Sequence, residues 1–280
     1  MNHQKNRIWA ISAEGMADML GKELPRGVFI AEQKVNSIEG SGPRAEMAKK
    51  LRGLLSPYFN QRPEMEIENG IATIHAYGPM MDDASPMDLA FGATSYEEIR
   101  ADLAMANAMD EVESIILVAR TPGGTVSGIE ETYQDIVNSE KPVYGYNAGM
   151  ATSAGYYLLA GTESITVSLS STTGNIGTVL DMWDFSGVYK KIGAKREVIT
   201  NEGADLKGTM RGPLQDSQRE FLQSQVDAMG EQFKNRVLEN RPDVDGEVFR
   251  AGWYRPEEAG ALGLIDAVGS LEELKLEIGS

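Results

Sequence analysis

The stretch Ile115-Ile116-Leu117-Val118-Ala119-Arg120 is an apolar run that predicts a buried strand, and Thr121-Pro122-Gly123-Gly124 follows it as a turn. Because glycine has no β-carbon, the backbone N–H groups of this turn are bare toward whatever lies above them. Further along, Ala151-Thr152-Ser153-Ala154-Gly155-Tyr156-Tyr157 places one serine among small residues where a predicted strand gives way to a helix. Each motif alone is common, as a simple turn or as close helix packing. Together they predict a serine nucleophile, Ser153, beside an oxyanion hole.

Strands and helices are predicted to alternate from about residue 67 onward. The predicted strands cover 71–77, 114–120, 142–146, 164–167, 176–180, 197–200, 249–254 and 264–268. The predicted helices cover 96–109, 129–138, 156–160, 185–192, 216–239 and 256–262. Ser95 and Glu98 form a capping-box pattern at the first of these helices. Such alternation predicts an α/β fold with a largely parallel sheet, flanking helices and a site at the carboxyl ends of the strands.

The chain divides into two predicted parts. Residues 1–64 form an N-terminal extension, a candidate arm or docking segment, with predicted helices at 13–20 and 44–55. Residues 65–280 form the main domain. Within it, the helix at 216–239 carries an apolar stripe that predicts core packing along its length. The stripe consists of Phe221, Val226, Met229, Phe233 and Val237.

Composition and charge exclude several classes of partner. There are 42 acidic and 26 basic residues, giving a net charge of −16, which argues against nucleic acid and anionic membranes. The chain has no cysteine, so disulfides, thiolate metal sites and a cysteine nucleophile are excluded. No run approaches the roughly 18 apolar residues of a membrane helix, and the polar N-terminus does not resemble a signal peptide. We therefore expect a cytosolic protein without stable membrane insertion.

A serine nucleophile needs a base, and the two histidines are poor candidates. His3 lies at the terminus, and His75 lies within a predicted strand, where a structural role is the commoner one. Lysine is the remaining option, because burial can lower the pKa of a lysine side chain enough for it to accept a proton. Lys207 is the only lysine between Lys195 and Lys234, in a glycine-flanked loop that follows a predicted strand. An exposed loop lysine is also common, so residue patterns alone leave this choice open.

Four motifs together resemble the signal peptide peptidase A family of serine peptidases, family S49, in order and spacing over residues 67–275. They are Thr121-Pro122-Gly123-Gly124, Ala151-Thr152-Ser153-Ala154-Gly155-Tyr156-Tyr157, Thr173-Gly174-Asn175-Ile176-Gly177 and Ala259-Gly260-Ala261-Leu262-Gly263-Leu264-Ile265-Asp266. The resemblance implies a ClpP/crotonase-like fold, peptide hydrolysis without metal or cofactor, and a ring-like homo-oligomer.

By position, the resemblance implies that Ser153 is the nucleophile and Lys207 the general base. It makes the N–H groups of Gly124 and Ala154 the oxyanion hole, with Gly123 and Asn175 in support. Asn175 departs from the family pattern, in which a serine commonly helps to hold the lysine. An asparagine carbonyl can still accept a proton from an ammonium group. We also expect Gly124→Val to impair turnover while leaving the fold intact.

The short form with an N-terminal Trp9-Ala10-Ile11 segment is similar to the phage branch of the family, the head-maturation or prohead proteases. This similarity implies scaffold and capsid proteins as substrates, in the host cytosol or inside a procapsid. Two alternatives remain open: a crotonase-type acyl-CoA enzyme, which also holds an oxyanion with two backbone N–H groups, and a non-catalytic capsid-assembly or scaffold protein.

Overall fold

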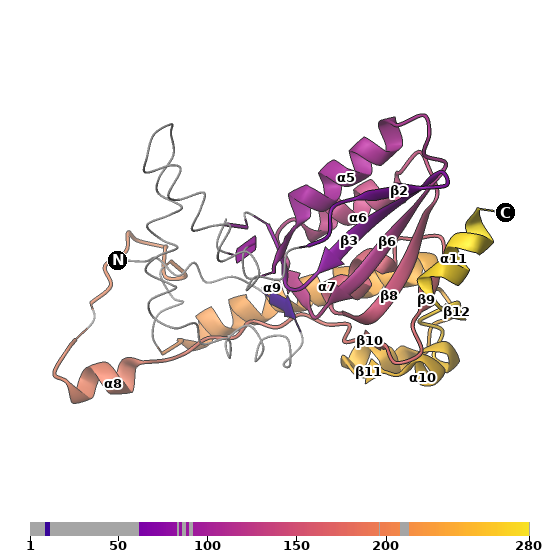
Figure 1. The fold of residues 1–280 in the computed structure, drawn as a ribbon. Coiled ribbons are helices and arrows are strands. Elements are labelled where there is room, and N and C mark those ends of the chain that lie inside the picture. Colours follow the sequence, from indigo (N-terminus) through magenta and orange to yellow (C-terminus); the bar gives the residue numbers. More distant parts are fainter. Residues whose placement is uncertain are drawn as a thin grey trace, which may run out of the picture.

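The computed structural model describes residues 9–11, 62–82, 84–85, 88–89, 92–195, 197–207 and 213–279. The helices predicted at 13–20 and 44–55, with most of the predicted extension 1–64, lie outside the described residues. Elements below carry the labels of Figure 1.

A mostly parallel sheet of eight described strands forms the centre of the domain (Figure 1). Its path runs β11-β10-β8-β6-β3-β2, with β9 beside β8 and β12 beside β9. Only β2 and β11, at the two ends of the path, pair antiparallel to their neighbours. The strands are β2 (Glu66–Glu68), β3 (Ile71–Tyr77), β6 (Ser114–Thr121), β8 (Val143–Thr152), β9 (Ile165–Val167), β10 (Thr172–Gly174), β11 (Trp253–Tyr254) and β12 (Ala267–Val268). The predicted α/β class with a largely parallel sheet is confirmed.

A second, smaller sheet lies at the carboxyl end of β6 and has the order β1-β7-β4-β5. Its strands are β1 (Trp9–Ile11), β7 (Gly123–Thr125), β4 (Met80–Met81) and β5 (Thr94–Ser95). Strand β4 pairs parallel to both β5 and β7, whereas β1 pairs antiparallel to β7. A short piece of the predicted N-terminal extension is therefore joined to the main domain through its backbone.

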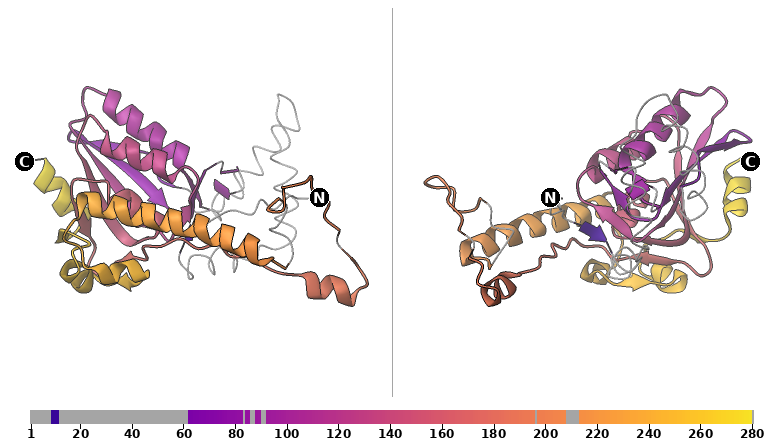
Figure 2. Two further views of the ribbon diagram at one scale, coloured as in Figure 1. Left: turned by 180° about the vertical axis from the view of Figure 1, so that it is seen from behind. Right: turned by 60° about the vertical axis from the view of Figure 1, so that its left-hand side comes forward.

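Helices cover both faces of the central sheet (Figure 2). The main core lies between one face and α5, α6, α7 and the C-terminal half of α9, while α11 packs on the other face through Leu274. Ser95 and Glu98 form the predicted capping box of α5. The helices are α5 (Tyr96–Ala108), α6 (Ile129–Val137), α7 (Ala154–Leu159), α8 (Ser186–Lys191), α9 (Asp216–Asn240), η2 (Gly246–Arg250), α10 (Pro256–Ala261) and α11 (Leu271–Ile278).

Residues 178–207 leave the domain as an arm, with α8 near its far end (Figures 1 and 2). The strands predicted at 176–180 and 197–200 were wrong: among the described residues neither segment forms a strand, and only Val179 makes an isolated bridge. The core role predicted for the whole stripe on α9 was also wrong. Phe233 and Val237 are buried, but Phe221 is 44% exposed, because the N-terminal half of α9 runs out beside the arm.

Helix α7 is held from behind by contacts with α6 and α9. The Tyr157 hydroxyl donates to Glu130 Oε2 at 2.5 Å, and the Arg236 guanidinium pairs with the same carboxylate from α9. The Tyr157 ring also packs on the Phe233 ring, with 4.8 Å between centroids. These contacts join three helices that are far apart in sequence at one carboxylate.

Glu130 remains ionised well below the usual pH range of a glutamate. Burial would raise the pKa of its carboxyl, but hydrogen bonds from Arg236, Tyr157, Gln232 and Gln134 outweigh burial and lower this pKa from 4.5 to about 2. A carboxyl whose pKa is lowered by folding contributes stability above its unfolded pKa, and this contribution is lost as pH falls toward the folded pKa. Glu130 therefore stabilises the fold above about pH 4.5.

We expect Glu130→Gln to lower the free energy of unfolding at pH 7. The difference from wild type should shrink between pH 4.5 and pH 2, because the wild-type carboxyl is protonated there as well. Urea midpoints measured across this range test the prediction. Glu131→Gln is the matched control, since Glu131 is the exposed neighbour and a surface change costs about 0.5 kcal/mol at most. A deficit that does not vary with pH would contradict the assigned role of the Glu130 charge.

Candidate active site

The two motifs that suggested a nucleophile and an oxyanion hole lie side by side. Thr121, at the end of β6, pairs with Ala151 near the end of β8. The Thr152 hydroxyl donates to the Pro122 carbonyl at 3.0 Å. Gly155 lies so close to Thr121 that an added β-carbon would be 2.5 Å from the threonine methyl group. The carboxyl ends of two parallel strands thus bring both turns to one edge of the sheet.

Ser153 lies at the junction of β8 and α7 with an unusual backbone conformation. Its φ is 54° and its ψ −122°, which a non-glycine residue adopts at a cost of about 1–3 kcal/mol. Its N–H donates to the Gly174 carbonyl at 2.8 Å, which holds the turn in place. Strained strand-to-helix turns present the catalytic serine in α/β hydrolases. The residue is nevertheless only 1% exposed.

Ser153 is followed directly by α7, and this helix contacts β7. Ala154 is the first residue of α7, and no side chain caps this helix within the described residues. Helix α7 packs against β7, which contains Gly123 and Gly124. Gly123 has φ 120°, a conformation that favours glycine. The structure therefore places the helix that follows Ser153 against the strand that holds the two glycines, and their roles in an oxyanion hole remain a prediction.

Asn175 also reaches this edge of the sheet. It follows Gly174, the residue whose carbonyl accepts the Ser153 N–H. Its own N–H donates to the Gly252 carbonyl at 2.6 Å, and its φ of 55° is left-handed. Asparagine tolerates this conformation better than most residues do. Its predicted contact with a lysine remains a prediction.

Lys207 lies apart from Ser153. It is exposed, in the loop that precedes α9, and this loop is tied to the start of α9 by a hydrogen bond from Gln218 to the Asp205 carbonyl. Helix α7 contacts α9 near Phe233, fifteen positions beyond Gln218, which corresponds to roughly 22 Å along the helix axis. No hydrogen bond joins Lys207 to Ser153 in the described part of the chain. Within the single chain, α7 after the candidate nucleophile therefore lies against β7, whereas the candidate base lies on the arm side.

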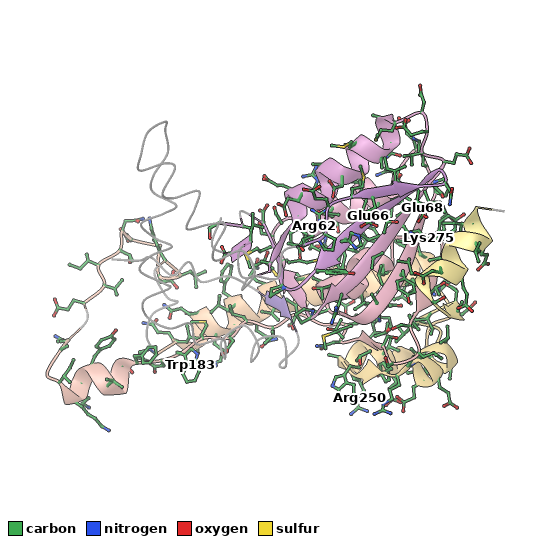
Figure 3. All side chains as sticks on the ribbon, viewed as in Figure 1. Arg62, Glu66, Glu68, Trp183, Arg250 and Lys275 are labelled. Atoms are coloured by element: carbon green, nitrogen blue, oxygen red, sulfur yellow. The ribbon has the colours of Figure 1, made fainter. Side chains whose placement is uncertain are left out.

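His75 lies inside the sheet, as expected for a structural histidine. It is buried on β3, packs edge-on to Tyr77 at 5.2 Å, and neither ring nitrogen has a partner among the described residues. Burial lowers the pKa of its imidazole, and the Arg62 and Lys275 charges lower it further, against the opposing effect of Glu66. Figure 3 shows these three charged residues at the β2 edge of the sheet. The imidazole is therefore neutral at pH 7.

The residues that hold α7 against α6 and α9 were not predicted from the sequence. Tyr157 belongs to the serine motif at 151–157. Its partner Glu130 is 27 positions away, and Arg236 lies 106 positions from Glu130. Neither partner has a local sequence signal. No group of three or more His, Asp or Glu side chains could hold a metal ion in the part of the chain that the structure describes.

This geometry defines a class: α/β proteins that present a serine on a strained turn, beside glycine backbone, at the carboxyl edge of a parallel sheet. The family model of Peptidase family S49 matches residues 135–279, and that of Clp protease matches residues 88–176. The chain belongs to peptidase family S49. The predicted family and ClpP-like fold class are confirmed.

Curated relatives match most of this chain. It is 29% identical to Capsid assembly protease C of Escherichia phage lambda, over 74% of this chain and 48% of that protein. It is 27% identical to Protease 4 of Haemophilus influenzae, over 97% and 47%, and 26% identical to the chloroplastic Serine protease SPPA of Arabidopsis thaliana, over 72% and 31%. The chain thus spans at most about half the length of these relatives.

Solved structures give a weaker comparison. An enoyl-CoA hydratase from Shewanella pealeana is 9% identical, with a TM-score of 0.46, over 81% of this chain and 75% of that chain. A likeness at this level carries no argument about function. Separately, none of the described helices combines the length and apolar character needed to span a bilayer.

Gly124 also has a packing role that the sequence did not reveal. A β-carbon at this position would overlap the Met80 carbonyl oxygen and lie 2.6 Å from the carbonyl carbon. Both atoms belong to the backbone of β4, which cannot easily move aside. The expectation that Gly124→Val leaves the fold intact is therefore unsound.

We expect Gly124→Ala to lower the free energy of unfolding by about 1–3 kcal/mol, because overpacking forces β4 and β7 apart. Gly230→Ala is the control: that glycine lies in α9 with open space around it, and alanine there should add up to about 1 kcal/mol. Chemical denaturation of both variants measures the difference. Equal stability of Gly124→Ala and wild type would show that the two strands can separate at little cost.

Proposed function

We propose that this protein is a serine endopeptidase in which Ser153 attacks the scissile carbonyl. The observation that carries the proposal is the strained Ser153 turn, which is followed by an uncapped helix start at Ala154 in a helix that packs against β7. Membership of family S49 supports the same chemistry. In this proposal the strained turn presents the serine hydroxyl to the N–H groups of Gly124 and Ala154.

The proposed reaction is acyl transfer in two steps. A neutral lysine accepts the Ser153 hydroxyl proton, the serine oxygen bonds to the carbonyl carbon, and the N–H groups of Gly124 and Ala154 stabilise the oxyanion. The lysine then protonates the leaving amine, which breaks the peptide bond. Water, activated by the same lysine, releases the acyl group and restores the serine. We assign the lysine as Lys207.

Because Lys207 lies on the arm side of α9, we propose that its arm completes the site of a neighbouring copy in a homo-oligomer. The arm is unusually apolar for a surface. Trp183 is 75% exposed and stacks on Phe185, and Ile192 and Ile199 are 71% and 94% exposed (Figure 3). Between the base of the arm and α9 lies an open groove of about 590 Å³. Exposed apolar patches of this kind mark protein interfaces.

For the biological role, we propose proteolysis of scaffold and capsid proteins inside an assembling phage procapsid, in the cytosol of the host. The phage lambda relative is named a capsid assembly protease, and this carries the proposal. The crotonase alternative is weaker, because an acyl-CoA enzyme has no use for a strained serine. A non-catalytic scaffold would not need it either.

We expect Ser153→Ala and Lys207→Ala each to abolish nearly all peptide hydrolysis, and the double variant to be scarcely worse, because nucleophile and base act as a unit. Lys207→Arg should be equally inactive, since a guanidinium stays protonated. Lys195→Ala, on the same arm, is the control and should remain active. Single-turnover rates on a peptide substrate check these outcomes, and multiplicative losses in the double variant would break the pairing.

The site shared between copies predicts complementation. When Ser153→Ala and Lys207→Ala chains are co-expressed with different tags and purified as mixed oligomers, roughly a quarter of wild-type activity should return, because one neighbour in a head-to-tail ring supplies the group that the other lacks. Mixing the two variants after each has assembled separately should restore less activity than co-expression does. If mixed oligomers form but stay inactive, Lys207 acts within its own chain.

Co-expression with the scaffold and capsid proteins of the same source tests the biological role. We expect trimmed proteins and mature heads with the wild-type chain, and untrimmed proteins with Ser153→Ala. Normal maturation with Ser153→Ala would refute the role while leaving the peptidase chemistry open to the peptide assay.

A further inference from the structure

The strand β1 occupies an edge next to the candidate nucleophile. Trp9, Ala10 and Ile11 pair antiparallel with Thr125, Gly124 and Gly123 in that order. Strand β1 is the end strand of its sheet, so removing it would expose the backbone of β7. The residues that would be exposed include both glycines of the candidate oxyanion turn.

Among the described strands, β7 has no other edge on which a peptide could add. Its other side is filled by β4, where Met80 pairs with Gly124 and leaves no room for even a β-carbon. Helix α7, which begins directly after Ser153, packs against β7 as well. An extended chain lying along the open edge of β7 would therefore run past the serine.

The chemistry of the edge favours recognition of backbone. Glycines at 123 and 124 present N–H and C=O groups without side chains, so an extended peptide can add as a strand largely independently of its sequence. Such an edge is suited to a peptide substrate. Strand β1 is already paired with it as an extended antiparallel strand, as a substrate would be. Ser153 is 1% exposed in this arrangement, so a substrate cannot reach it until a covering segment moves.

We propose that β1 is an intramolecular occupant of the peptide-binding edge of β7, and that it holds the site closed until an extended peptide displaces it. The inhibition of catalysis by β1 rests on the proposed peptidase function. The competition between β1 and a peptide for the edge of β7 does not depend on that function. A substrate strand and β1 would need the same backbone groups of Gly123–Thr125 and cannot be bound together.

The strength of the contact suits a reversible block. A three-residue strand makes only a few ladder hydrogen bonds, each worth about 0.5–1.5 kcal/mol net. Because β1 belongs to the same chain, a free peptide must compete with a local concentration that can reach the millimolar range. A weak but tethered strand lowers the apparent affinity for dilute peptides and yields to concentrated ones, as in a crowded assembly.

Binding of a defined peptide to the full-length chain tests the competition without catalysis. The probe is a fluorescent, capped peptide with the sequence of residues 7–13, added to protein carrying Ser153→Ala. In one variant Ala10→Pro and Ile11→Pro are combined. Successive N–H groups of a strand point to opposite sides, so one of the two prolines must remove a donor to β7. The matched control combines Ala10→Val with Ile11→Val, which keeps both N–H groups.

We expect the proline variant to bind the probe about tenfold tighter than the valine control, because its edge is vacant. In protein with unaltered β1, saturating probe should speed amide hydrogen exchange at residues 9–11 while residues 123–125 stay protected. Equal affinities in the two variants, no binding, or binding without faster exchange at 9–11 would each overturn the proposal. The exchange experiment decides the question if the proline variant does not fold.

Fluorophosphonate labelling of Ser153 separates this inference from the proposed function. With Ser153 intact, the proline variant should be labelled several-fold faster than the valine control. If the probe displaces β1 but neither protein is ever labelled or cleaves peptides, the competition holds and the peptidase assignment fails. If both are labelled at one rate and bind the probe equally, the peptidase stands and β1 is a structural strand.

Discussion

The site depends on close packing at two glycines. At Gly124 the carbonyl of Met80 fills the space of a side chain, and at Gly155 the methyl group of Thr121 does so. The first contact fixes β7 against β4, and the second fixes α7 against the end of β6. Since Ser153 lies between them, its strained conformation is held by packing on both sides. Larger residues at either glycine would push β7 away from β4 or α7 away from the end of β6.

Much of this arrangement could be predicted from local sequence. The apolar run at Ile115, the capping box at Ser95 and Glu98, and the small residues around Ser153 each impose a structure on their own neighbourhood. The parallel order of the strands then brings both turns to one edge. The arm could not be predicted in this way, because 176–180 and 197–200 have the residue types of strands but form no strand in the part of the chain that the structure describes. The position of Lys207 was missed for the same reason: no strand precedes it.

Helix α9 explains why Lys207, the candidate base, lies far from Ser153. Its C-terminal half is fixed in the core by Phe233 and by the ion pair of Arg236 with Glu130, directly behind the helix that follows the serine. Its N-terminal half runs out beside the arm and holds the Lys207 loop through Gln218. A continuous helix transmits this separation rigidly. The distance between the two halves of the candidate dyad is thus set by helix geometry, which favours completion of the site by a neighbouring copy.

The apolar arm and the edge of β7 carry the same risk of unwanted association, but only the edge of β7 is covered. Unpaired strand edges and apolar surfaces both associate with whatever chain is near, and proteins commonly cover them. Here the apolar arm remains exposed, whereas the edge of β7 beside the serine is paired with the chain's own Trp9–Ile11. An edge that recognises backbone alone has little means of rejecting an unsuitable peptide. Peptide binding must then be controlled by the timing with which the edge becomes free. A short tethered strand provides this control, because only a few hydrogen bonds must break to release it.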